Sequence, residues 1–243
     1  RHVIFSAHGV SKAVRKDATS ISATIYDATC PLVTKVHKEV ARRQKQNHQV
    51  ILIGHNGHPE VEGTLGQSND SKKITLVETA ADIKNLNFSE NIDISYTTQT
   101  TLSVDDTKQI VGLLKAKFPQ IQSPKKSDIC YATQNRQDSV KVIIKNAEML
   151  LVIGSKNSSN SNRLREIAEN NNKPAYLIDG ASDIDIEWLR GITSVGVTAG
   201  ASAPEVLVKE VVDFLLDNGA DEIIEVSGAN ESVHFPVPAT LRV

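Results

Sequence analysis

Two cysteines are the residues of this chain whose placement most needs a chemical explanation, Cys30 in "DATCPLV" and Cys130 in "SDICYAT". Each follows a strand-like run, precedes a helical pattern and has Thr, Asp or Gln nearby. Thiolates at such positions suit a soft metal or an iron–sulfur cluster. CxxC spacing is absent, which excludes a compact zinc knuckle. Two thiolates rarely complete a cluster, so a third ligand is expected elsewhere.

Two imidazoles and a carboxylate form a second group with possible chemistry. His8 lies in "SAHGV" and can be either a functional group or the polar end of a strand. His58 and Glu60 form an HxE triplet, which suits a metal or an acid–base pair but also occurs by chance in surface loops. The other histidines are assigned to structure or carry no signal; they are His2, His37, His48, His55 and His234.

Residues 154–163, "GSKNSSNSNR", offer hydroxyl and amide donors at the predicted start of a helix. Backbone N–H groups at a helix N-terminus favour anions, so this segment is a candidate anion site. The alternative is a solvated helix cap with redundant capping residues. Ser202 in "TAGASAPE" repeats the pattern. Neither loop matches the P-loop or the dinucleotide-binding glycine pattern, so nucleotide binding is not indicated.

Hydroxyls also gather in "YTTQTTLSVDD", where Thr100 follows Gln99 at the end of a predicted strand. The alternative explanation of this cluster is β-propensity followed by helix capping.

The elements that must position these residues alternate along the chain. Strand-like apolar runs occupy residues 2–7, 22–28, 49–55, 73–78, 92–98, 149–155, 174–179 and 194–200. Apolar residues at helical spacing occupy 32–46, 103–118, 137–147, 160–171 and 202–219. Strand, polar loop and helix also recur in 3–14, 50–63, 150–164 and 195–207. This alternation predicts an α/β fold with parallel sheets, in which ligands bind beyond the carboxyl ends of the strands.

Composition limits the classes of function. The 243 residues carry a formal net charge of −2, with 40% hydrophobic and 4% aromatic residues, so neither nucleic-acid nor membrane binding is indicated. The low cysteine count and lack of a secretory segment favour a reducing, cytoplasmic location, with a plastid also open. Residues 119–128 are the best candidate for a domain boundary. The chain begins with Arg1 and enters a strand at once, so we expect a preceding segment.

Seven motifs in register resemble the 4-hydroxy-3-methylbut-2-enyl diphosphate reductase family, also called IspH or LytB. They are "SAHGV", "DATCPLVTKVH", "IGHNGHPEVEGT", "TQTTLSVDDT", "DICYATQNRQ", "GSKNSSNSNRL" and "TAGASAP". The resemblance implies a three-lobed α/β fold of pseudo-threefold symmetry, with small parallel αβα lobes around a central site and an incomplete first lobe. It places the remainder of the first lobe in 1–30, the second in 31–127 and the third, with a C-terminal tail, in 128–243.

The family's chemistry implies roles for particular residues. Cys30 and Cys130 would be two of three ligands of a [4Fe–4S] cluster, with the third before residue 1. Glu60 and Thr100 would hold the allylic hydroxyl of the substrate and relay its proton. The substrate's diphosphate would be bound by His8, His58, Ser158, Ser159, Asn160 and Ser202. The reaction would give isopentenyl and dimethylallyl diphosphate in the methylerythritol phosphate route of isoprenoid synthesis, with electrons from ferredoxin or flavodoxin.

Two other functions remain open from the sequence. One is a diphosphate-binding module, or an inactive fragment of the enzyme, which would have no need of Glu60, Thr100 or paired thiols. The other is a zinc hydrolase built on His8, His58 and Glu60, which would leave both cysteines unused. The acid, the threonine and the two thiols together favour the reductase.

Overall fold

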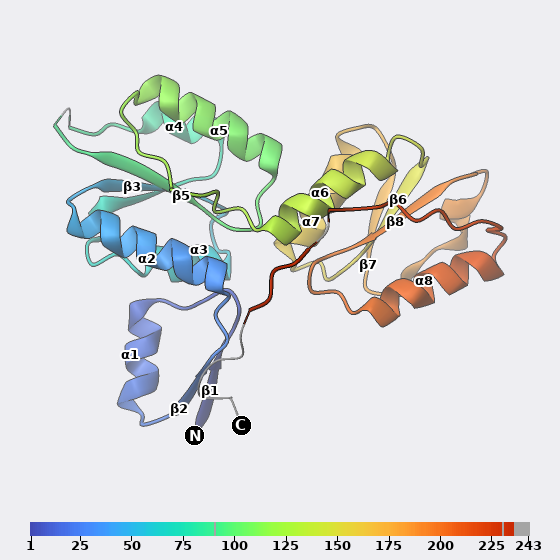
Figure 1. The fold of residues 1–243 in the computed structure, drawn as a ribbon, viewed down its shortest axis with the longest axis horizontal. Coiled ribbons are helices and arrows are strands. Elements are labelled where there is room, and N and C mark those ends of the chain that lie inside the picture. Colours follow the sequence, from blue (N-terminus) through green and yellow to red (C-terminus); the bar gives the residue numbers. More distant parts are fainter. Residues whose placement is uncertain (90, 230, 236–243) are drawn as a thin grey trace. The chain divides into compact units, whose positions relative to one another are not determined.

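Three small, entirely parallel sheets form the framework of the computed structural model, which describes residues 1–89, 91–229 and 231–235 (Figure 1). The strands are β1 (His2–Phe5), β2 (Thr24–Asp27), β3 (Gln49–Ile53), β4 (Ile74–Val77), β5 (Ile94–Thr98), β6 (Met149–Ile153), β7 (Ala175–Ile178) and β8 (Val195–Ala199). Their orders are β1-β2, β4-β3-β5 and β7-β6-β8. The α/β class predicted from the sequence is therefore confirmed.

Helices connect these parallel strands, as βαβ units require. They are α1 (Lys12–Ser20), α2 (Pro31–Lys45), α3 (Pro59–Leu65), α4 (Ala80–Asn85), α5 (Val104–Lys117), α6 (Tyr131–Ile143), α7 (Ser159–Glu169) and α8 (Glu205–Asp217). Short 3-10 turns occupy Ser71–Lys73, Ala181–Asp183 and Ile186–Leu189.

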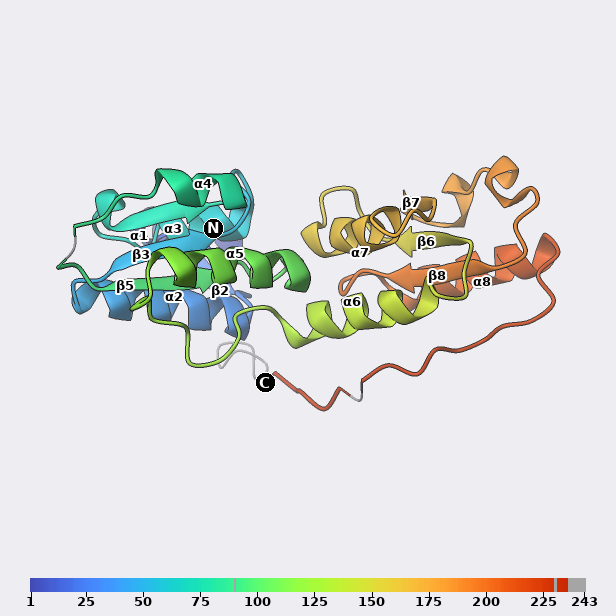
Figure 2. The same ribbon diagram turned by 90° about the horizontal axis from the view of Figure 1, so that it is seen from above.

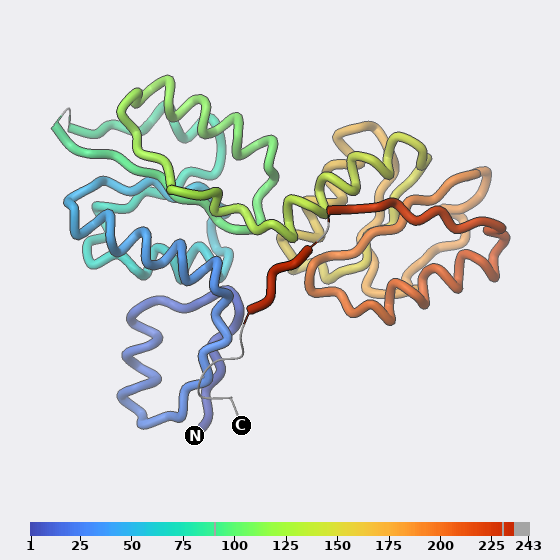
Figure 3. Tube along the Cα trace, viewed as in Figure 1, coloured from blue at the N-terminus to red at the C-terminus, as the bar shows by residue number. Residues whose placement is uncertain are grey.

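The chain divides into two compact units, which are followed most easily along the tube in Figure 3. The N-terminal unit contains Arg1–Thr100 and Val104–Cys130, and so holds the first two sheets. The C-terminal unit contains Thr101–Ser103 and Tyr131–Ser232, and so holds the third sheet.

The sheet of the C-terminal unit is covered on both faces because alternate residues of its central strand β6 point to opposite sides. Leu150 and Val152 pack against α6 and α7, while Leu151 and Ile153 belong to the core on the α8 side (Figure 1). Seen from above, the strands of this sheet lie side by side in the order β7-β6-β8 (Figure 2). Every residue of β6 is buried, which explains why its sequence is a continuous apolar run instead of an alternating one.

The central sheet of the N-terminal unit follows the same plan. Val50 and Leu52 of β3 form a core with Val40 of α2 and Val61 of α3. Figure 1 shows α4 and α5 on the opposite side of this sheet. The strand β3 is buried throughout.

All eight predicted strands are present, but the prediction of the helices is less complete. Helix α4 was not predicted, and α6 begins at Tyr131, six residues before the predicted start. The early turns of α6 bury polar side chains, Thr133 and Gln137, so their sequence lacks the apolar periodicity of a helix. Helix α8 is capped by Pro204, so the prediction that it starts at Ser202 is wrong. Gly219 follows α8 with φ +107°, as expected for a residue that ends a helix.

Residues 119–128, predicted to be a domain boundary, are attached to the edge of β5. The Gln122 N–H donates to the Ile94 carbonyl over 2.9 Å, and the Tyr96 N–H donates to the Gln122 carbonyl over 3.1 Å. Each sheet falls within one predicted lobe, whereas the lobe boundaries themselves stay predictions. Residues 230 and 236–243 of the third predicted lobe lie outside the described residues.

Within the described ranges, no helix is long and apolar enough to cross a membrane.

The packing of Leu164 gives a test of the C-terminal core. Its side chain is fully buried between α6, α7 and β6, so Leu164→Ala should lower the free energy of unfolding by about 2–5 kcal/mol. Leu216→Ala, on an exposed position of α8 in the same unit, is the matched control and should cost less than about 1 kcal/mol. Chemical denaturation followed by circular dichroism measures both; equal losses would show that Leu164 is not a core residue.

Candidate functional site

A buried acid, Glu60, lies where helix α3 meets the end of β5 in the N-terminal unit. It follows Pro59 in the first turn of α3 and is only 2% exposed. Its two carboxyl oxygens accept hydrogen bonds from one residue: the Thr100 N–H donates to Oε1 over 2.6 Å and the Thr100 hydroxyl donates to Oε2 over 2.8 Å. Thr100 lies just beyond β5, so the sheet edge and the helix start meet at this pair.

Burial raises the pKa of Glu60 to about 7, because the ionised carboxylate loses its hydration. The negative charge of Asp128 adds to the rise, while the two hydrogen bonds from Thr100 oppose it. A carboxyl group with this pKa is partly protonated at neutral pH. It can therefore donate a proton there, which an ordinary surface glutamate cannot do efficiently.

His58 is the N-cap of α3 and stands beside His8. Its Nδ1 accepts the Glu60 N–H over 3.1 Å, so the neutral ring carries its proton on Nε2. Burial and the neighbouring imidazoles of His8 and His55 lower the pKa of His58 to about 4. The rings of His8 and His58 meet edge to face with centroids 5.4 Å apart. The structure thus brings these two predicted site residues together.

The turn that carries His8 needs a glycine at its next residue. Gly9 has φ +74°, and a Cβ there would lie 2.7 Å from Cε1 of His37. His37 is partly buried, and burial lowers its pKa to about 4. Its role is therefore to pack beneath the turn, in agreement with its structural assignment.

Both cysteines are free thiols, partly buried, at the ends of backbone segments that approach this region. Cys30 is the N-cap of α2, makes no side-chain capping bond, and donates its N–H to the Ala7 carbonyl over 3.0 Å. Cys130 donates its N–H to the Thr100 carbonyl over 2.8 Å. Free, uncapped thiols fit a soft-metal ligand set, although the described ranges contain no group of three or more His, Cys, Asp or Glu that could hold a metal ion.

The C-terminal unit carries the predicted anion-binding residues at one end of its sheet. Ser158 caps α7 by accepting the Ser161 N–H over 3.2 Å, and Ser159 directs its hydroxyl to the Thr101 carbonyl over 3.3 Å. Asn160 is 5% exposed, and its side-chain oxygen and nitrogen are both buried with no hydrogen-bond partner in the described part of the chain. A buried amide left in this state indicates that a ligand supplies the missing partners.

Ser202 lies on the neighbouring loop of the same unit. The strands β6 and β8 are adjacent and parallel, so the loops that follow them leave the sheet at the same edge. The Gly200 N–H donates to the Ile153 carbonyl over 2.8 Å, which ties the start of this loop to β6. Ser202 is exposed beyond that point.

Sequence reasoning missed two residues of this region. Asp128 is a buried carboxylate that binds the end of β5, and Lys35 of α2 pairs with it. Asp128 precedes Cys130 by two residues in a polar segment, and its sequence carries no signal of burial. Gln99 was noted only as part of a hydroxyl cluster, whereas its side-chain oxygen accepts the His55 N–H over 3.0 Å.

These features define an α/β protein with a buried carboxyl group of raised pKa and two free thiols, each directly before a helix, α2 or α6. The family model "LytB protein" matches residues 1–216. The curated 4-hydroxy-3-methylbut-2-enyl diphosphate reductase of Ruthia magnifica is 68% identical over 240 residues, covering 99% of this chain and 78% of that protein. The reductase of Pseudomonas aeruginosa is 56% identical, covering 99% and 77%. The chain belongs to the LytB family.

Two solved structures are also similar. The structure of E-1-hydroxy-2-methyl-but-2-enyl-4-diphosphate reductase from Plasmodium falciparum aligns with a TM-score of 0.85 at 39% identity, over 88% of this chain and 67% of that one. A second structure of (E)-4-hydroxy-3-methyl-but-2-enyl diphosphate reductase aligns with a TM-score of 0.58 at 33% identity, over 89% and 76%. The resemblance inferred from the seven motifs is thus confirmed at the level of the family, fold and enzyme.

The raised pKa of Glu60 predicts how stability depends on pH. In the unfolded chain this carboxyl ionises near pH 4.5, and in the folded chain near pH 7, so between these values the folded state binds more protons. The contribution of Glu60 to stability is therefore largest below pH 4.5 and declines as pH rises to 7, by on the order of 3 kcal/mol. The stability of wild type minus that of Glu60→Gln, measured by urea unfolding, should fall across this window. A flat difference would contradict the raised pKa.

Proposed function

We propose that this chain carries out reductive removal of the allylic hydroxyl of 4-hydroxy-3-methylbut-2-enyl diphosphate, with Glu60 as the proton donor. The observation that carries the assignment of roles is the buried Glu60 carboxyl, which accepts two hydrogen bonds from Thr100 and has a pKa of about 7. Membership of the LytB family supports the substrate and the reaction class.

The reaction requires a proton at the departing oxygen. Breaking the carbon–oxygen bond and releasing water consumes two electrons and two protons and leaves an allylic or isomeric alkene diphosphate. When bound, a [4Fe–4S] cluster supplies the electrons and a Lewis-acidic iron. Cys30 and Cys130 would hold that cluster, with a further cysteine ligand outside this pair.

Glu60 and Thr100 act on the hydroxyl of the substrate. Because Glu60 is partly protonated at neutral pH, it can give its proton as the oxygen leaves. The Thr100 hydroxyl bonds one Glu60 oxygen and can both donate and accept, so it orients the carboxyl and can pass the proton on. Their burial keeps water from competing for the proton.

Neutral donors in each unit are proposed ligands of the diphosphate. In the N-terminal unit, His58 presents an Nε2–H beside His8. In the C-terminal unit, Asn160 has an unpartnered buried amide at the start of α7, where backbone N–H groups favour an anion. The remaining proposed donors there are Ser158, Ser159 and Ser202.

The electrons come from an external carrier, for which ferredoxin or flavodoxin is the proposal, since the sequence contains no recognisable nicotinamide or flavin motif. The competing function is a diphosphate-binding module without chemistry. Such a module would not need a buried acid with a raised pKa, and the family assignment favours the enzyme.

Replacing the proposed proton donor separates these two functions. Glu60→Gln keeps the size of the side chain and removes its proton, so turnover should fall about 100-fold or more while substrate affinity changes little. Turnover is measured anaerobically with a chemical reductant, and affinity by isothermal titration of the substrate. Glu62→Gln, on the exposed face of the same helix, is the matched control and should keep full turnover. A Glu60→Gln variant with undiminished turnover would remove Glu60 from the mechanism.

The proposed ligand role of Cys30 is tested by metal analysis. Protein purified anaerobically, with its mass verified, should contain about four irons and four acid-labile sulfides per chain. Cys30→Ser should lose stably bound iron, because a neutral hydroxyl is a poor ligand for a soft metal. Thr34→Ser on the same helix is the control and should retain the iron. Full iron and sulfide in Cys30→Ser would exclude Cys30 as a ligand.

A further inference from the structure

We propose that Lys35 of α2 is a positioning residue for Cys130: it holds the segment 126–130 against the end of β5 and thereby fixes this thiol relative to Cys30. The proposal rests on the proposed function only in taking both cysteines as cluster ligands. The positioning itself is a property of the chain without a cofactor.

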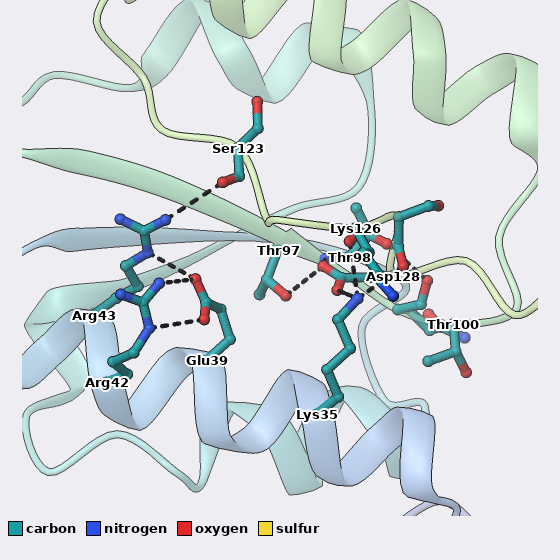
Figure 4. A network of polar contacts seen from close by, with 12 residues as sticks. Lys35, Glu39, Arg42, Arg43, Thr97, Thr98, Thr100, Ser123, Lys126 and Asp128 are labelled. Atoms are coloured by element: carbon teal, nitrogen blue, oxygen red, sulfur yellow. Dashed lines mark hydrogen bonds and ion pairs between the residues drawn. The ribbon is translucent and has the colours of Figure 1, made fainter.

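The ammonium group of Lys35 contacts three oxygens of this segment. It donates to the carbonyls of Lys126 and Ser127, each over 2.8 Å, and pairs with Asp128 Oδ1 over 2.9 Å (Figure 4). The two carbonyl contacts are hydrogen bonds, whereas the Asp128 contact is an ion pair, because Oδ1 has no hydrogen-bond partner in the described part of the chain. The backbone of the segment is thus folded around one cation that comes from a helix far away in sequence.

Asp128 links the same segment to the sheet. Its side chain is fully buried, with Oδ2 accepting the Thr97 hydroxyl over 2.7 Å and the Thr98 N–H over 3.1 Å (Figure 4). Both residues lie at the carboxyl end of β5. Lys35 faces the other oxygen of this buried carboxylate and supplies the counter-charge that burial requires.

The segment held by Lys35 and Asp128 is also bonded, through Thr100, to Cys130 and Glu60, the two groups proposed to take part in the chemistry. Two residues after Asp128, Cys130 donates its N–H to the Thr100 carbonyl over 2.8 Å. The N–H and hydroxyl of Thr100 in turn bind Glu60. Lys35 and Asp128 therefore set the course of the backbone just before it reaches Cys130 and Thr100.

Helix α2 connects this attachment to the other thiol. Cys30 is the N-cap of α2, and Lys35 leaves the helix in its second turn. Arg43, two turns further on the same face, also reaches the segment. It donates to the Gln122 side chain and, over 3.4 Å, to the Ser123 carbonyl; Figure 4 shows the second of these contacts. One rigid helix thus carries Cys30 at its start and holds the segment that ends at Cys130.

The experiment compares the reactivity of the two thiols in cofactor-free protein. Lys35→Met keeps the apolar stem and removes the ammonium group, so the segment should open more often and iodoacetamide should alkylate Cys130 at least about fivefold faster. Cys30 is the internal reference, since its N–H bond to Ala7 does not involve Lys35. Peptide mass spectrometry reports both rates in one sample.

Three further variants make the result specific. Arg42→Met removes a cation from the same helix, where its partner is the Glu39 carboxylate, and should change neither rate. Lys35→Arg keeps a cationic donor and should restore slow alkylation of Cys130. Asp128→Asn, if it folds, should act in the same direction as Lys35→Met.

Equal acceleration of both thiols, or none, in Lys35→Met would overturn the proposal. The proposal would also be overturned if Cys130 were alkylated as fast in Lys35→Arg as in Lys35→Met. The iron content of the parent protein distinguishes a failure of the Lys35 proposal from a failure of the proposed function. A parent without iron would count against the cluster, and the alkylation rates would still decide whether Lys35 positions Cys130.

Discussion

The burial of one carboxyl group, Glu60, is the constraint on which the rest of the site depends. Its desolvation is tolerated because the first turn of α3 and the end of β5 meet, so that Thr100 can satisfy both oxygens. His58 caps the same helix through the Glu60 N–H, which also fixes the tautomer of its ring. Acid, hydroxyl and imidazole are therefore held by one junction between helix and sheet.

The thiols depend on a second junction, formed by α2 and the segment that follows α5. This segment was expected to separate domains, and the division between the two compact units does follow it, between Cys130 and Tyr131. The segment itself lies along β5 from Gln122 to Cys130. A polar stretch rich in Lys, Ser and Pro resembles a linker in the sequence, because the residues of β5 and α2 that it bonds are distant along the chain. Its attachment comes from backbone bonds and from the side chains of α2, neither of which has a local sequence signal.

Apolar runs made the strands predictable, since β3 and β6 are buried on both faces and so consist almost wholly of aliphatic residues. The early start of α6 was missed because Thr133 and Gln137 are buried there, and polar residues conceal helical periodicity. The positions of His58, Glu60 and Thr100 were predicted through family motifs, whereas their contacts needed coordinates. Lys35 and Asp128 were missed because an ion pair between residues 93 positions apart leaves no pattern in a single sequence.

The unpartnered amide of Asn160 has a consequence for the energetics of the free protein. A buried donor and acceptor without partners cost about 1–3 kcal/mol, so the C-terminal unit is less stable than its packing alone would allow. A ligand that bonds both atoms removes this penalty and adds its own binding free energy to the folded state. If the proposed substrate is that ligand, its supply in the cell also sets how long the folded protein survives unfolding and proteolysis.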